Sequence, residues 1–420
     1  MELLGKQLNN SGLVGVDMEA TVHNPDRYMG DLRQMLAQGR KRIGVLLGAG
    51  GPASILADEA SGKLSKIGKP LIPTIAGLTQ TVIQGLTKAD VAVVNDVCKD
   101  LGPNPNIEMI LSRVRSLAAL IGCNSIYGCD GSAFTQLSQR ICESIGKVVG
   151  ACLPVENNPY TELAGWIGGT DRSHPIEMFT PNYDLLMEEA LERLEIPYFD
   201  GFSGGFEPFF DPASISNDNL PSRWVRLWKL HGSLGWADNK RGGIIRGKGR
   251  SATLLIFPDH LKYDQIQKLP FIALFDRLRK FLTTPDTLLL TCGFSFADKH
   301  IVAVLDEALA ANPAGSVFAF QYQSLEHEQA ACALASKRPN MSVYAEDGAI
   351  VNCITAPWVP RELPSPNWDV IRASFWEARE TGSGGTFLLG DFASFARFVS
   401  LTHAERIAIS GDISNVEVAE

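Results

Sequence analysis

Several features that this sequence lacks limit what the protein can be. The uncharged segment 70–87 is interrupted by proline, glutamine and threonine, so no run of about eighteen apolar residues predicts a membrane span. The N-terminal residues have neither a basic start nor a long apolar core, so no signal peptide is expected. None of the 8 cysteines belongs to a C-x-x-C pair, so neither a zinc ribbon nor a thioredoxin motif is visible. We therefore expect a soluble, cytoplasmic protein with reduced thiols.

The charge balance disfavours nucleic acid as a general partner. With 38 basic and 47 acidic residues, the net charge is −9. A local exception is the glycine-rich segment Lys240–Arg250, KRGGIIRGKGR. We interpret it as a solvated hairpin, and a contact with nucleic acid or with an acidic partner surface is the alternative.

The length of 420 residues, with 45% hydrophobic and 20% charged residues, is typical of a globular protein with a sizeable core. We divide it into an N-terminal extension (1–40), a main domain (41–345) with a helical insertion at about 82–170, and a C-terminal appendage (346–420). The appendage is rich in phenylalanine and leucine, so it either packs on another subunit or folds back onto the main domain.

The most informative stretch is Arg42–Leu56, RIGVLLGAGGPASIL. Ile43–Leu47 reads as a buried strand and Gly48-Ala49-Gly50 as a tight turn, and Pro52 suits the start of a helix. This arrangement can present backbone N–H groups to a pyrophosphate, as in dinucleotide-binding proteins. A strand–helix turn without a ligand is the alternative. A dehydrogenase would place an acidic residue roughly 20 residues further on to bind ribose, and the region 66–81 has none.

Periodicity predicts a Rossmann-like, doubly wound α/β fold with a parallel sheet. Helices are expected at 26–36, 89–98, 107–121, 134–149 and 368–379, and a further helix is expected directly after Asp184. Loops are expected at 157–175 and 199–222. Further strands are expected at 176–179, 224–230, 253–257 and 286–292, and 317–320 reads as the last strand.

Polar residues follow several of these strands at their carboxyl ends, where ligands of doubly wound sheets bind. They are Thr180, Asn182 and Asp184 in TPNYD, His231 in KLHGS, and Gly293, Ser295 and Asp298 in GFSFAD. Each also has a structural interpretation: Asn182, Asp184 and Asp298 as helix caps, His231 as a hydrogen-bonding core histidine, and Ser295 as a turn residue. Their convergence on one edge favours a shared site.

These motifs, in this order over roughly residues 41–322, resemble those of the sirtuin family. More closely, the chain is similar to bacterial sirtuin-like NAD hydrolases of anti-phage defence, in the subclass that assembles with a HerA-type hexameric ATPase. The resemblance implies NAD+ as a substrate rather than a cofactor, and a homo-oligomer. The lack of a long apolar run predicts no membrane partner. Two features differ from sirtuin deacylases. Residues 232–291 contain no cysteine, so no zinc is expected, and Gly51-Pro52-Ala53-Ser54 replaces the start of an acidic segment. Water is therefore expected as the acceptor in place of an acyl-lysine.

The resemblance also implies roles for individual residues. Gly48, Ala49 and Gly50 would hold the pyrophosphate, with Ser54 nearby, and Asn182 would hold water and ribose hydroxyls. His231 would act as general base. Asp184 would meet the nicotinamide carboxamide, while Ser295 and Asp298 would face the adenosine side. The predicted function is NAD+ hydrolysis to nicotinamide and ADP-ribose; the alternative is a non-catalytic NAD- or ADP-ribose-binding module that regulates a partner ATPase.

Overall fold

The computed structural model describes residues 21–58, 61–239, 243–247, 269–361, 368–379 and 384–401. The main sheet comprises β1 (Arg42–Leu47), β4 (Glu177–Thr180), β5 (Tyr198–Phe199), β8 (Val225–Lys229), β11 (Thr287–Cys292), β12 (Ser316–Phe320), β13 (Met341–Tyr344), β14 (Gly348–Val351) and β15 (Ile354–Pro357). Its 9 strands lie in the order β15-β14-β13-β12-β11-β1-β4-β8-β5. Strands β13 to β5 are parallel, and β14 and β15 add an antiparallel edge. The predicted doubly wound α/β class is confirmed.

Strand β1 lies at the point where the chain changes direction across the sheet. It pairs with β11 from Arg42↔Thr287 to Leu47↔Cys292, and with β4 on its other side. After β1 the chain builds β4, β5 and β8 on one side of it, and then crosses to build β11, β12 and β13 on the other side. The carboxyl ends of β1 and β11 therefore form a topological switch point. The predicted site residues follow β1, β4, β8 and β11, which are neighbours in this order of strands.

The sheet separates two apolar cores because successive side chains of a strand point to opposite faces. In β11, Leu288 and Leu290 enter one core and Leu289 enters the other. Helices α11 (Phe271–Thr283), α12 (Lys299–Ala311) and α13 (Gln329–Lys337) cover the second core. Helices α1 (Pro25–Ala37), α7 (Pro159–Gly169), α8 (Leu186–Arg193) and α14 (Trp368–Phe375) contribute to the first.

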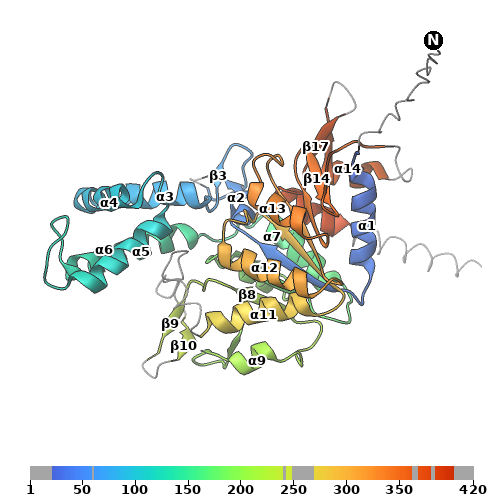
Figure 1. Cartoon of the computed structure of the whole chain (residues 1–420). Coiled ribbons are helices and arrows are strands. Elements are labelled where there is room, and N and C mark those ends of the chain that lie inside the picture. The colour runs from blue at the N-terminus through green and yellow to red at the C-terminus, as the bar shows by residue number, and fades with distance from the viewer. Residues whose placement is uncertain are drawn as a thin grey trace, which may run out of the picture.

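The predicted helical insertion projects to one side of the sheet (Figure 1). It contains α3 (Ile75–Gln84), α4 (Lys88–Leu101), α5 (Ile107–Ile121) and α6 (Gly131–Val149). The last three correspond to the predicted helices, and Asn106 caps α5 by accepting a 2.9 Å hydrogen bond from Met109 N. Helix α3 was not predicted.

Two predicted loops are wrong in part. Within 157–175 lies α7, which Asn158 caps in a reciprocal capping box with Thr161, and Pro159 occupies its first position. Within 199–222 lie β6 (Phe202–Ser203), β7 (Phe209–Phe210) and α9 (Pro212–Ser216). Glycines at the end of α7 and within 199–222 favour loops in the sequence. The Asn158-Pro159 start of α7 is nevertheless a recognisable helix cap.

The prediction that 317–320 is the last strand is also wrong. β13, β14 and β15 follow in the same sheet, so the sheet continues across the expected boundary between residues 345 and 346. Further on, the helix expected at 368–379 ends at Phe375 and is followed by β16 (Trp376–Ala378), which pairs with β17 (Gly385–Phe387). The described part of the appendage folds back, because Phe375, Phe387 and Phe395 are buried in the first core.

Hydrogen bonds between side chains join α1, the first described helix, to α14 in this C-terminal segment. Asp26 in α1 is buried, and its Oδ1 accepts hydrogen bonds of 2.8 Å from Trp368 Nε1 and from Arg372 Nε. Two elements from opposite ends of the described chain therefore pack as neighbours (Figure 1).

Smaller sheets surround the main one. β6, β7, β10 (Ile244–Arg246) and β9 (Trp236–Asp238) form one, and β2 (Leu56–Ala57) pairs with β3 (Lys69–Pro70). Of the segment predicted as a hairpin, 240–250, only residues 243–247 are described. They contain β10, which pairs antiparallel with the preceding β9, and Arg246 pairs with Asp200. The strand predicted at 253–257 lies outside the described residues. Among the helices that the structure describes, none combines the length and apolarity of a membrane span.

Buried charges fix the amino ends of β4 and β8. Glu177 accepts hydrogen bonds from Arg277 Nε at 2.7 Å and from Trp228 Nε1 at 2.8 Å, while Arg226 and Arg277 also reach Asp218. The side chains of Glu177, Arg226 and Arg277 are each at most 3% exposed. Removing one partner from such a network leaves uncompensated buried charge.

We therefore expect Glu177→Gln to lower the free energy of unfolding by about 3–5 kcal/mol. Urea unfolding measures this loss. The matched control is Asp276→Asn, which breaks an ion pair with Arg279 whose side chains are 45% and 62% exposed, and we expect it to cost less than about 1 kcal/mol. Equal effects of the two variants would contradict the importance of burial.

Candidate functional site

Two glycine turns meet at the switch point. Gly48 N donates to Cys292 O at 3.0 Å, and Gly50 N donates to Gly293 O at 2.9 Å. A Cβ on Gly48 would lie 2.3 Å from Gly293 O, and a Cβ on Gly50 would lie 2.6 Å from Gly293 Cα. Gly293 itself has φ of +61°, which favours glycine. Backbone packing between the turns therefore explains all three glycines.

This packing bears on the predicted pyrophosphate cradle. The amides of Gly48 and Gly50 both donate within the chain, and helix α2 (Gly50–Ala53) after the turn is only 4 residues long. Ser54 Oγ donates to Gly51 O at 2.8 Å. Ala49 is exposed at the tip of the turn. Phosphate binding by these residues stays a prediction. Helix α2 is too short for its dipole to support that binding.

Asn182 is anchored to the first glycine turn. Its Nδ2 donates to Gly48 O at 3.0 Å, and its backbone N donates to Thr180 Oγ1 at 3.0 Å. Thr180 Oγ1 in turn donates to Leu47 O at 2.7 Å. The alternative of Asn182 as a helix cap is wrong, because the side chain that serves the start of α8 is Asp184, whose Oδ1 accepts from Leu186 N at 3.1 Å.

A buried ionic cluster lies behind Asn182. Lys229, the last residue of β8, donates from Nζ to the backbone carbonyl of Asp184 and pairs with Glu188 at 3.2 Å. Burial raises the pKa of both carboxyl groups, and the Lys229 ammonium partly offsets that rise. The cluster ties β8 to the loop that follows β4.

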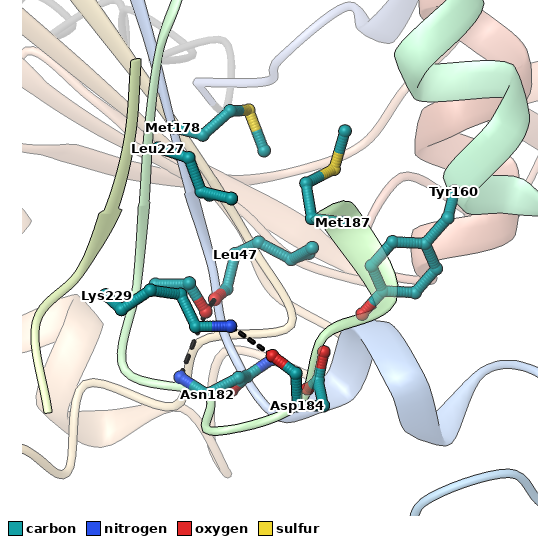
Figure 2. A pocket seen from close by; sticks show the side chains of 9 residues that line it. Leu47, Tyr160, Met178, Asn182, Asp184, Met187, Leu227 and Lys229 are labelled. Carbon is teal, nitrogen blue, oxygen red and sulfur yellow. Dashed lines mark hydrogen bonds between the residues drawn. The ribbon is translucent and has the colours of Figure 1, made fainter. Parts of the chain in front are cut away.

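A small cavity lies against this cluster (Figure 2). Asn182, Asp184 and Lys229 form its polar side, and the Tyr160 hydroxyl points toward Asp184. Burial, followed by the nearby carboxylates, raises the pKa of Tyr160 well above its usual value. The cavity measures about 10 Å³, the space of roughly one water molecule. Asp184 is 5% exposed, so contact with a nicotinamide ring needs this loop to move.

His231 lies on the next loop, after β8. Leu230 N donates to Thr180 O at 2.8 Å and Leu234 N donates to Tyr183 O at 3.0 Å, so the loops after β4 and β8 are joined. The His231 ring stacks on Phe275 with centroids 6.3 Å apart, and its side chain is 3% exposed. The sequence motifs therefore converge on adjacent loops, as predicted.

Asp298 faces His231 across the edge of the sheet. Its Oδ2 lies 2.9 Å from His231 Nε2, and its Oδ1 caps α12 by accepting from His300 N and Ile301 N. Ser295 is exposed on the intervening loop. The predicted adenosine contacts of Ser295 and Asp298 stay predictions, whereas the pairing of Asp298 with His231 is new.

Sequence reasoning missed the roles of Lys229, Glu188 and Tyr160. A signal existed for Lys229, because a lysine inside the apolar run 224–230 needs a buried partner. Glu188 lies on α8 and Tyr160 on α7, and neither carries a comparable signal. Among the residues that the structure describes, no group of three or more His, Cys, Asp or Glu side chains is placed to hold a metal ion.

The meeting of the two turns can be tested with a matched pair of glycines. Gly62 has φ of +65° and nothing within 4 Å of the position that a Cβ would take, whereas a Cβ on Gly293 would lie 2.8 Å from Gly50 Cα. We expect Gly62→Ala to cost about 1–2 kcal/mol from the left-handed backbone alone. Gly293→Ala should cost a further 1–3 kcal/mol or so from overpacking. Urea unfolding compares them, and equal losses would contradict the close approach.

Comparisons with known proteins agree in part with this site. Residues 176–342 match a family model described as "SIR2-like domain", a range that includes Asn182, His231 and Asp298 but not the turn after β1. A search of curated proteins found no match. A solved structure titled "Structural Basis for the Mechanism and Regulation of Sir2 Enzymes" is 12% identical, covers 76% of this chain and 92% of its own, and has a TM-score of 0.33. The family match supports a sirtuin-like fold over residues 176–342 and an NAD-related activity in general.

Proposed function

We propose that this chain is an NAD+ glycohydrolase that releases nicotinamide and ADP-ribose. The observation that supports this most is the placement of Asn182 and His231 on joined loops at the switch point, with Asn182 bonded to the glycine turn after β1. Doubly wound sheets bind their ligands at this position. Both residues also lie in the range that matches the SIR2-like family.

The chemistry follows from the side chains at this edge. Cleavage of the bond between ribose C1′ and the nicotinamide nitrogen passes through an oxocarbenium-like state, and the bonding electrons leave with nicotinamide. The bond to Gly48 uses one N–H of Asn182, and the amide retains a second N–H and an oxygen with capacity for ribose hydroxyls or water. A water oxygen then bonds to C1′ while His231 takes the proton.

Water is the proposed acceptor because residues 232–291 contain no cysteine to build the zinc-ordered small domain of sirtuin deacylases. His231 is 3% exposed and the nearby cavity has space for roughly one water molecule. Substrate entry therefore requires the loops after β4, β8 and β11 to separate, a motion common in enzymes that exclude bulk water.

We extend the proposal to the biological role that the motifs imply. The chain would act as a cytoplasmic anti-phage effector that depletes NAD+, in a homo-oligomer assembled with a HerA-type ATPase. The closed site favours one second candidate, a non-catalytic module that binds NAD or ADP-ribose to regulate such a partner.

The test is nicotinamide and ADP-ribose release by the chain, alone and with a candidate ATPase partner. Asn182→Ala and His231→Ala should each lower turnover by about 10²-fold or more while folding is retained. Matched controls are Asn124→Ala and His327→Ala, two exposed positions outside the site. Full turnover in both site variants would contradict the site, and measurable NAD binding without turnover in the complete assembly would favour the regulatory module.

A further inference from the structure

Tyr160 carries a polar group into the first core. The residue lies in the first turn of α7 and is 1% exposed. Its ring meets the ring of Phe392 in the C-terminal segment edge-on, with centroids 5.0 Å apart, and a Cβ on Gly51 would lie 3.0 Å from the Tyr160 hydroxyl oxygen. Packing from both sides therefore holds the hydroxyl between the turn after β1 and the cavity beside the loop after β4.

This hydroxyl is a buried donor that other side chains and the backbone do not satisfy. Among the residues that the structure describes, none forms a hydrogen bond with it. Burial raises the pKa of Tyr160 well above its usual value, so the oxygen keeps its proton. Buried polar groups nearly always have a partner, because an unpaired donor has lost its hydration without compensation.

The small cavity has the space and the lining for such a partner. The Tyr160 hydroxyl points toward Asp184, with no direct hydrogen bond between them (Figure 2). The cavity of about 10 Å³ is large enough for roughly one water molecule and too small for a larger ligand. Asn182, Asp184 and Lys229 line it, and a site occupied by water needs two to four polar partners of this kind.

The hydrogen-bonding capacities of these groups match one water molecule. Lys229 has three N–H donors, and its partners are the Asp184 carbonyl and the Glu188 carboxylate. Asp184 Oδ1 accepts from Leu186 N, and a carboxyl group has capacity for further donors. Water accepts two hydrogen bonds and donates two, so it can accept from Tyr160 and Lys229 while it donates to Asp184.

We propose that the cavity binds one structural water molecule, which joins the Tyr160 hydroxyl to the Asp184 carboxyl group and the Lys229 ammonium. Through this water, Tyr160 is a positioning residue for the loop after β4, which carries Asn182. The positioning role rests on the proposed hydrolysis of NAD+, whereas the water site does not. Because Phe392 packs on the Tyr160 ring, the same link connects the C-terminal segment to the site.

A crystal structure of the full unsubstituted chain at high resolution tests the water site directly. We expect one ordered water within about 2.6–3.2 Å of the Tyr160 hydroxyl, the Asp184 carboxyl group and Lys229 Nζ. A cavity without electron density, or a water that does not contact Tyr160, would overturn the proposal. This measurement requires neither activity nor a substituted chain.

Unfolding of Tyr160→Phe in urea tests the same link by the sign of its effect. A hydroxyl bonded to the water contributes to stability, so we expect its removal to raise the equilibrium constant of unfolding about threefold to tenfold. A hydroxyl without a partner predicts an unchanged or lower constant, because phenylalanine removes its desolvation cost, and that result would overturn the water link. The control Tyr198→Phe removes an exposed hydrogen bond of 2.8 Å to Glu192, and we expect less than a twofold or so change.

NAD+ hydrolysis by the full chain with its partner assembly tests the positioning role. We expect Tyr160→Phe to lower kcat about tenfold with KM changed less than about threefold, because the loop that carries Asn182 loses a restraint. Tyr198→Phe should keep both values. An unchanged or increased kcat in Tyr160→Phe would overturn the positioning role. A chain that does not hydrolyse NAD+ but shows the ordered water would contradict the proposed function and support the water site.

Discussion

The close approach of two backbone turns is the constraint on which the site depends. Gly48 and Gly50 after β1 press against Gly293 after β11, with no space for a Cβ on any of them. This contact joins the turn after β1 to the turn after β11 at the carboxyl end of the sheet. Asn182 bonds to Gly48 O, so the loop after β4 takes its position from the same contact. Lys229 then ties β8 to that loop through the Asp184 carbonyl.

Much of the fold was readable because buried parallel strands are continuous apolar runs. β1, β4, β8 and β11 were predicted close to their observed bounds, and the polar residues after them lie at one edge. The elements that were missed have weaker signals. β13 to β15 are only 4 residues each and follow a change in composition, and β14 and β15 pair antiparallel at the edge. The two glycines at the end of α7 favour a loop, although the capping box at its start indicates a helix.

The site itself was predictable in its residues but not in its pairings. Motif spacing places Asn182, His231 and Asp298 at strand ends, yet nothing in the sequence says which oxygen of Asp298 faces which ring. The glycines show a similar limit. A Gly-x-Gly turn suggests a phosphate cradle, and only the three-dimensional contact with Gly293 shows that backbone packing also requires glycine there. Two charged residues lie within buried strands, Glu177 at the amino end of β4 and Lys229 at the carboxyl end of β8. Because each is buried, each needs an ionic partner, which is Arg277 for Glu177 and Glu188 for Lys229.

The central place of β1 has a consequence for biosynthesis. β1 pairs with β11, whose residues leave the ribosome only after the helical insertion, β4 and β8 have been made. Contacts that are distant in sequence form slowly because loop closure costs entropy. Helices α4 to α6 form from local contacts and can fold early. The apolar β1, in contrast, keeps one edge without a partner strand until β11 has been made. The nascent chain is therefore most exposed to aggregation before Thr287–Cys292 emerges, and this interval is when a chaperone would be needed.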